Sequence, residues 1–251
     1  MRSFDYIESG KTLLTPHTTS LLAAIHEAKG RQSIQTTIRP DILGTLVAVA
    51  RIQSTDASNR IEGISTSDSR LNDLVSEKVT PRNRNEEEIA GYRDALSVIH
   101  ESHDYIPITP NVILQLHRDL FRHTPLTFAG HFKDSDNVII ERDAHGTSTV
   151  RFAPPSALVT PELIERACSA YTQAIRDGHT DPLLAIAMFI LDFICIHPFN
   201  DGNGRMSRLL TLLMLCRNGY MVGKYISIEH LIEQSKSTYY EALAASTQGW
   251  D

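Results

Sequence analysis

Apolar residues recur at helical spacing in several segments of this chain, and this pattern predicts a mainly α-helical fold. The segment 182–196 is apolar nearly all round, which is typical of a helix buried at the centre of a domain. A second helix is predicted from Met206 to Arg217, and Asn218-Gly219 is a suitable stop for it. We therefore expect a tight loop between these two helices.

Two framework helices are predicted upstream, at residues 86–96 and 113–120, where apolar residues return every three or four positions. β-branched residues instead dominate segments 137–142 and 148–152, and the residues between them are a hairpin signal. The chain is therefore expected to form a helical domain with one short β-hairpin.

The loop between the two central helices carries groups suited to phosphate chemistry. Gly202 and Gly204 are expected to take unusual backbone conformations that leave N–H groups free for an anion at the start of the following helix. Asn203 adds an amide donor. Arg205 and Arg208 lie one turn apart, so both guanidinium groups are expected to reach a polyphosphate.

Asp201 and His197 add a carboxylate and a base to the same loop. Asp201 is a hard oxygen ligand suited to Mg²⁺, which usually binds through one or two carboxylates and substrate phosphates. His197 has an ordinary pKa near neutrality and can take a proton from an attacking hydroxyl. Each residue alone is commonly a turn, core or surface residue, so it is their joint occurrence that indicates function.

The loop sequence, His-Pro-Phe-Asn-Asp-Gly-Asn-Gly-Arg-Met-Ser-Arg, resembles the signature of the Fic family, His-x-Phe-x-Asp/Glu-Gly-Asn-Gly-Arg-x-x-Arg, at every fixed position. The resemblance implies a Fic-type helical domain that binds ATP and Mg²⁺ and transfers AMP to a protein hydroxyl, releasing pyrophosphate. The related Doc kinases depart from Gly-Asn-Gly, which favours AMP transfer over phosphoryl transfer here. By this resemblance the general base is His197, the metal ligand is Asp201, and the ATP-binding residues are Gly202, Asn203, Gly204, Arg205, Ser207 and Arg208, the last on the γ-phosphate.

A second resemblance lies far upstream, in segment 51–64. Ser58 and Glu62 share one face of a predicted helix that Gly63 ends, which taken alone is an ordinary helix terminus. Beside a Fic loop, however, the spacing Ser-x-x-x-Glu-Gly is similar to the inhibitory motif on an N-terminal helix of many Fic proteins. The resemblance implies that Glu62 pairs with Arg208 and repels the γ-phosphate, while Ser58 braces the anion loop.

The hairpin and the C-terminal tyrosines each have two interpretations. By resemblance the hairpin is the flap that aligns a target segment by strand pairing, with Val138, Ile139 and Ile140 as target-binding residues, but a plain surface hairpin suits the residues equally well. Tyr239 and Tyr240 resemble the family segment that lines the adenine pocket. The alternative is a terminal amphipathic helix whose aromatic residues pack on the core, and both can hold.

Composition limits the remaining possibilities. The 251 residues, 41% of them hydrophobic, can bury a sizeable core, and no Pro/Ser/Gly linker divides them. We expect one compact unit, with an N-terminal helical region at residues 1–80 carrying the inhibitory helix and the Fic catalytic core at 81–251. The net charge of -6 argues against nucleic acid or an anionic membrane as the main partner. A cytoplasmic protein is expected, because the only long apolar run is too short to span a bilayer and three cysteines suit buried thiols: Cys168, Cys195 and Cys216.

The sequence thus predicts an adenylyltransferase that modifies Ser, Thr or Tyr hydroxyls of other proteins and of itself, autoinhibited by Glu62. One alternative is the reverse reaction, in which Glu62 orients a water against the phosphodiester of an AMP-modified protein. Another is a non-enzymatic nucleotide-binding regulator, which is disfavoured because His197 and Asp201 are both present. The target protein, the modified residue, a possible homo-oligomeric state and a further domain after residue 251 stay open.

Overall fold

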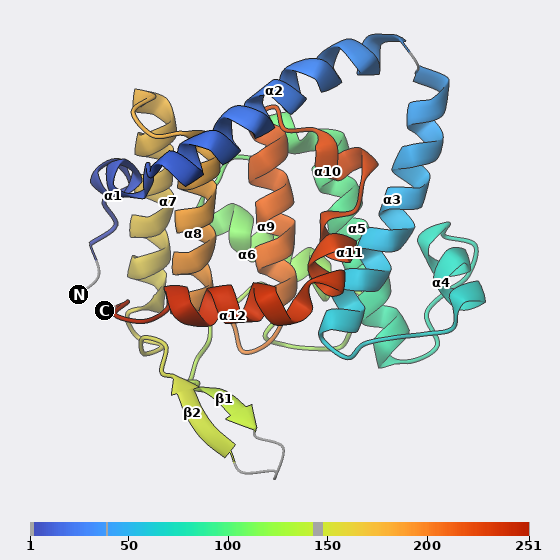
Figure 1. Ribbon diagram of the computed structural model, residues 1–251. Helices are drawn as coiled ribbons and strands as arrows, with labels where there is room; N and C mark the ends of the chain where they lie inside the picture. Colours follow the sequence, from blue (N-terminus) through green and yellow to red (C-terminus); the bar gives the residue numbers. More distant parts are fainter. Residues whose placement is uncertain (1–2, 39, 143–147, 251) are drawn as a thin grey trace.

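The computed structural model describes residues 3–38, 40–142 and 148–250, which form a helical domain with a two-stranded sheet (Figure 1). The predicted mainly α-helical class with a short hairpin is confirmed. The described helices are α1 (Tyr6–Leu13), α2 (Pro16–Ile38), α3 (Pro40–Ile61), α4 (Asp68–Val75), α5 (Arg84–Ser102), the 3₁₀ turn η1 (His103–Tyr105), α6 (Pro110–Leu120), α7 (Thr160–Asp177), α8 (Pro182–Ile196), α9 (Asn203–Arg217), α10 (Val222–Tyr225), α11 (Ile228–Gln234) and α12 (Lys236–Ser246), and the strands are β1 (Ile139–Arg142) and β2 (Ser148–Phe152).

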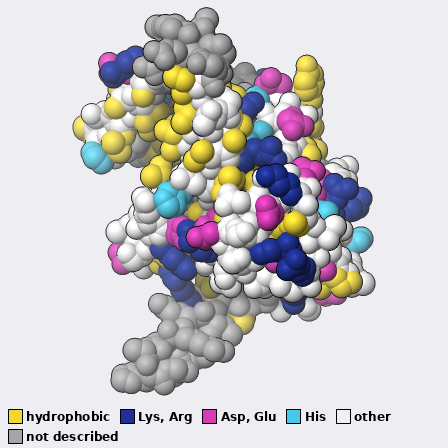
Figure 2. Space-filling view, turned by 90° about the vertical axis from the view of Figure 1, so that its right-hand side faces the viewer, with side chains coloured by type: hydrophobic (Ala, Val, Ile, Leu, Met, Phe, Trp, Pro, Cys, Tyr) yellow, Lys and Arg dark blue, Asp and Glu magenta, His cyan; other side chains and the backbone are white. Residues whose placement is uncertain are grey.

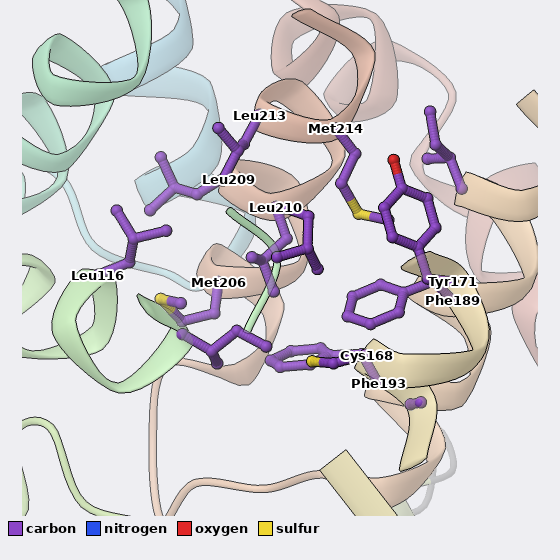
Figure 3. Close-up of a cluster of buried hydrophobic side chains, with 14 of the residues drawn as sticks. Leu116, Cys168, Tyr171, Phe189, Phe193, Met206, Leu209, Leu210, Leu213 and Met214 are labelled. Carbon is purple, nitrogen blue, oxygen red and sulfur yellow. The ribbon is translucent and has the colours of Figure 1, made fainter. Parts of the chain in front are cut away.

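The core is built around α8 and α9, the two helices that flank the predicted loop. Helix α8 packs between α7 and α9, so its apolar residues are covered on both sides, as expected for a central helix. Figure 3 shows side chains of α6, α7, α8 and α9 meeting in this core, all of them buried. The labelled residues are Leu116, Cys168, Tyr171, Phe189, Phe193, Met206, Leu209, Leu210, Leu213 and Met214.

The start of each central helix follows from its local sequence. Asp181 caps α8 by accepting the Leu183 N–H at 2.9 Å, and Pro182 occupies the first turn. Helix α9 begins at Asn203, three residues before the predicted start at Met206. The Gly-Asn-Gly segment is therefore not all loop, because its last two residues form the first turn of α9.

Helix α3 is fixed through its C-terminal half. Figure 2 shows hydrophobic side chains on the outer surface where the upper part of α3 lies, and Leu46 and Val49 are 40% and 47% exposed. From Ala50 onward one face of the helix is buried against α5 and α11. It ends at Ile61, and Gly63 with φ +78° lies in the turn that follows, as expected of a glycine helix stop, where the N–H of Ile64 donates to the Asn59 carbonyl at 3.0 Å.

The predicted hairpin projects from the helical body below α12 (Figure 1). Strands β1 and β2 are antiparallel, with Ile139 opposite Phe152, Ile140 opposite Val150 and a bulge after Ile139. The predicted turn at 143–147 lies outside the described residues.

Two predictions from composition can be compared with the fold. All three cysteines are buried, as predicted. Within the described part of the chain, no helix combines the length and apolar content that crossing a bilayer requires. The division into residues 1–80 and 81–251 stays a prediction, although α3 and α4 both pack directly on α5.

Candidate functional site

An open-sided cavity with a volume of about 210 Å³ lies between the α8–α9 loop, the hairpin and α12. It brings together residues from four segments that are distant in the sequence. The charged and polar lining comprises Glu62, Arg151, His197, Asn203, Gly204, Ser207 and Arg208, and the mostly apolar lining comprises Ile139, Phe152, Ile194, Cys195, Tyr239, Tyr240, Leu243, Ala244 and Thr247.

His197 ends α8 in a conformation that favours glycine. Its φ is 50° and its ψ 62°, and its N–H donates to the Phe193 carbonyl at 3.0 Å. A non-glycine residue in this region is strained, and such strain often marks a functional site. Burial lowers the pKa of His197, with smaller opposing effects from the Ile194 backbone and from Glu62 and Asp201. The imidazole is therefore neutral near pH 7 and able to accept a proton.

His117 on α6 holds this loop, a role that the sequence analysis did not assign. Its Nδ1 accepts the N–H of Gly130 at 2.9 Å, so its Nε2 carries the proton and donates to the Asp201 carbonyl at 3.1 Å. Its ring stacks on Phe199 with centroids 3.7 Å apart. Burial lowers the pKa of His117 to about 4, which keeps this hydrogen-bond pattern in place at neutral pH.

Lys133 and Asn137, just before the hairpin, also support the loop. The buried Lys133 ammonium donates to the Ile196 carbonyl at 3.1 Å and to Asn137 Oδ1 at 3.0 Å. The Asn137 amide in turn lies 3.5 Å from the His197 carbonyl and 3.4 Å from that of Phe199. Burial lowers the pKa of Lys133 to about 8. The base of the hairpin is thus linked to the backbone at His197.

The two glycines of the loop serve different purposes. Gly202 has φ +81° and precedes α9, as predicted, but Gly204 has ordinary helical geometry, so the prediction for its backbone is wrong. Space explains Gly204, because a Cβ there would lie 2.3 Å from Glu62 Oε1. The Asn203 side chain lines the cavity, but it is not free for phosphate as predicted. Its amide donates to the Phe199 carbonyl at 2.8 Å and its oxygen accepts the Phe199 N–H at 3.0 Å.

Arg205 is not brought to the cavity, contrary to the prediction that it reaches a polyphosphate. Its side chain is 1% exposed, with Nη1 2.7 Å from Glu88 Oε2 on α5. The guanidinium also lies 5.0 Å from the Phe121 ring centroid, and its Nη2 is 3.9 Å from Asp201. Arg205 therefore ties α9 to α5 and stands behind the loop.

Asp201 fits a metal only together with a substrate. Its Oδ1 accepts the Gly202 N–H at 2.6 Å, its Oδ2 lies 3.6 Å from Arg84, and its side chain is 46% exposed. Among the described residues, no group of three or more His, Cys, Asp or Glu side chains is placed to hold a metal. A cation at Asp201 would need oxygens from phosphates and water, which is how Mg²⁺ usually binds.

Arg208 is paired with Glu62, as predicted. Its Nη2 donates to Glu62 Oε1 at 2.7 Å, and the guanidinium also donates to Ser58 through its hydroxyl at 2.8 Å and its carbonyl at 2.9 Å. Ser58 therefore contacts Arg208, not the anion loop. Burial alone lowers the pKa of Arg208, but Glu62 and Tyr92 raise it above its ordinary value. The Glu62 carboxylate lies against the first turn of α9, where a helix N-terminus favours an anion.

The hairpin and α12 form the mostly apolar wall. Of the predicted flap residues, Ile139 lines the cavity and Val138 is 51% exposed, while the Ile140 side chain lies outside what the structure describes. Tyr239 and Tyr240 both line the cavity from α12, and their assignment to an adenine pocket stays a prediction. Burial raises the pKa of both phenols, so they stay neutral donors.

A model of the Fic/DOC family matches residues 107–215 of this chain. A Fido domain-containing protein of Dictyostelium discoideum is 37% identical over 90 residues, which are 34% of this chain and 58% of that protein. A protein adenylyltransferase Fic of Nematostella vectensis is 24% identical over 202 residues, 76% of this chain and 42% of that protein. The chain thus spans about half the length of these relatives.

Among solved structures, a Fic family protein from Desulfovibrio desulfuricans superimposes with a TM-score of 0.75 at 24% identity. The match covers 95% of this chain and 69% of that one. It shows a shared fold that extends from the N-terminal helices to α12, well beyond the segment matched by the family model.

Proposed function

This chain belongs to the Fic/DOC family, and from that premise we propose that it transfers AMP from ATP to a hydroxyl side chain of a protein, itself included. The observation that carries the proposal is one cavity lined by a neutral histidine, the start of α9 and a buried arginine. Each supplies what nucleotidyl transfer needs: a proton acceptor, an anion site and a fixed positive charge.

The lining suggests how ATP is held. The adenine of ATP is proposed to lie against Tyr239, Tyr240 and Phe152, where aromatic rings offer stacking surfaces. The phosphates are proposed to lie at the first turn of α9, whose N-cap residue Gly202 makes no side-chain cap. Mg²⁺ held at Asp201 would supply charge neutralisation of the phosphates.

The transfer step is an in-line displacement at the α-phosphorus. His197 accepts the proton of the target hydroxyl, whose oxygen forms a bond to the α-phosphorus, and the bond from that phosphorus to the bridging oxygen of pyrophosphate breaks. Pyrophosphate leaves with the electron pair. The strained backbone of His197 and its supports at Lys133 and Asn137 keep the imidazole in place.

Autoinhibition by Glu62 is part of the proposal. The carboxylate pairs with Arg208 and lies beside Gly204, so it occupies the position proposed for a terminal phosphate. Two like charges cannot share this site without a large cost. ATP therefore binds weakly or in an unproductive pose while Glu62 stays in place.

The test compares Glu62→Gly and Glu62→Gln with the wild type, using ATP labelled at the α-phosphate and Mg²⁺. Glu62 is 33% exposed, so its pair with Arg208 is placed at the low end of the roughly 1.5–3 kcal/mol for a charge-assisted hydrogen bond, about a tenfold gain in automodification. Glu233→Gln is the matched control, because Glu233 on α11 pairs with Arg60 on α3, two residues before Glu62, and this pair does not line the cavity. Arg208→Ala in the Glu62→Gly background should remove the gain, and equal labelling of all variants would refute autoinhibition.

The same carboxylate also favours the reverse reaction as a second candidate. Glu62 and His197 line one cavity, so Glu62 is placed to orient a water against the phosphodiester of a modified protein. This reaction requires the carboxylate, whereas transfer is inhibited by it. If Glu62→Gly cannot remove AMP from a pre-modified protein that the wild type clears, the hydrolase function is supported. Nucleotide binding without either reaction would point to a regulator.

A further inference from the structure

The two ends of the described chain meet at one buried carboxylate. Asp192 lies in the middle of α8 and is fully buried. Its Oδ2 accepts the Tyr6 hydroxyl at 2.7 Å and its Oδ1 accepts the Trp250 indole N–H at 2.5 Å. In Figure 1, α1 and the C-terminal end of α12 lie at the same edge of the molecule.

Trp250 is the buried side chain that follows α12. All of Lys236–Ser246 is described, and none of its residues is buried, whereas Trp250 just beyond it is 7% exposed. The backbone N–H of Trp250 donates to the Thr247 carbonyl at 3.4 Å. The helix that carries Tyr239 and Tyr240 is therefore fixed at its C-terminal end by one side chain outside it.

The same tryptophan contacts the hairpin. Its ring meets Phe152 edge-on, with centroids 6.0 Å apart and planes at 68°. Phe152 pairs with Ile139 across the sheet, and both line the cavity. The neighbouring Arg151 donates to the Tyr240 carbonyl at 3.2 Å, so β2 and α12 are joined directly as well.

We propose that Trp250, hydrogen-bonded to Asp192, is a positioning residue that sets two walls of the nucleotide cavity, α12 and β2. The inference rests on the proposed nucleotide-binding function of that cavity. Without the bond to Asp192 the indole N–H would be buried and unpaired, which favours release of the ring from its seat. Release would move the aromatic wall of α12 and the hairpin together, and both the nucleotide and the target segment would lose their support.

A pair of matched substitutions separates this role from simple stability, because Trp250→Phe and Tyr6→Phe each remove one donor from the same carboxylate. Trp250→Phe should raise the KM for ATP and the calorimetric Kd for ATP about tenfold, because the lost hydrogen bond has a charged acceptor, and kcat should change little. Tyr6→Phe should lower the Tm to a similar extent but leave both constants within about twofold. Equal effects of the two substitutions on Kd, or no effect of Trp250→Phe, would overturn the proposal.

Hydrogen exchange tests the anchorage of α12 even if the cavity binds no nucleotide. The amides of residues 236–246 should exchange faster in Trp250→Phe than in Tyr6→Phe, whether or not ATP binds, so the anchorage is tested apart from the proposed function. If Trp250→Phe does not fold, two measurements on the wild-type protein test the proposal. Trp250 is the single tryptophan of the chain, so an ATP analogue should change the tryptophan emission and slow exchange in α12. Analogue binding that changes neither would overturn the proposal.

Discussion

His117 is the most distinctive support of the α8–α9 loop, and His117→Phe tests this role. The substitution keeps a ring that can stack on Phe199 and removes both hydrogen bonds. The buried Gly130 N–H then loses its partner, at roughly 1–3 kcal/mol, and loss of the bond to the Asp201 carbonyl adds about 1 kcal/mol. At ~2–4 °C per kcal/mol for a domain of this size, the Tm should fall by roughly 4–16 °C. Transfer should fall by about tenfold or more, because the loop carries the proposed metal ligand.

The pH dependence of stability gives this prediction a second, independent readout. Burial lowers the pKa of His117 from 6.5 to about 4, so between these values the unfolded chain binds a proton that the folded chain does not. Stability therefore falls as the pH falls from about 6.5 to about 4, by up to roughly 3 kcal/mol from this one group. His117→Phe lacks this loss, so its deficit relative to the wild type should shrink between about pH 7 and pH 4.5.

Urea unfolding and activity assays at the two pH values measure both effects, with His131→Phe as the control. His131 is exposed on the segment next to Gly130, so its substitution removes an imidazole without removing a buried bond. If His117→Phe matches His131→Phe in Tm, urea midpoint and transfer rate, His117 does not hold the loop.

Three further predictions concern other ionisable groups. His197→Ala should lower AMP transfer on the order of 10² to 10⁴-fold while calorimetric ATP affinity stays nearly unchanged, and wild-type transfer would remove His197 as the base. Asp201→Ala should leave a low rate that no longer responds to Mg²⁺, so a wild-type Mg²⁺ titration curve would exclude it as the ligand. Burial lowers the pKa of His100 to about 4, and among the described residues neither of its ring nitrogens has a partner. The folded protein therefore loses stability through His100 too as the pH falls from about 6.5. Relative to the wild type, the free energy of unfolding of His100→Leu in urea should rise by roughly 2–3 kcal/mol between about pH 7 and pH 4.5, and a constant difference would contradict the burial argument.

The parts of the site that lie close together in the sequence were predictable. The helix at 182–196, the loop after it and the hairpin each carry their own local pattern, and the structure shows all three. The pairing of Glu62 with Arg208 joins residues 146 positions apart, and only the resemblance to a known motif could suggest it.

Side-chain direction at the loop could not be predicted, because packing between helices decides it. Arg205 follows two glycine positions and suits a phosphate site by type, yet α9 begins early and turns this side chain towards Glu88 on α5. His117 and Lys133 lie in segments whose patterns predict only framework structure. Their roles arise from contacts with carbonyl groups more than 60 positions away, which leave no periodic signal.

The central claim is that this site transfers AMP, and the phosphorus that reaches the protein tests it most directly. Glu62→Gly protein is incubated with Mg²⁺ and ATP labelled either at the α- or at the γ-phosphate, with Glu62→Gly/His197→Ala as the control. The account predicts label on the protein from α-labelled ATP alone, and none in the control. Label from γ-labelled ATP would show phosphoryl transfer, and no label from either would show that the site does not modify protein, so either result would contradict the account.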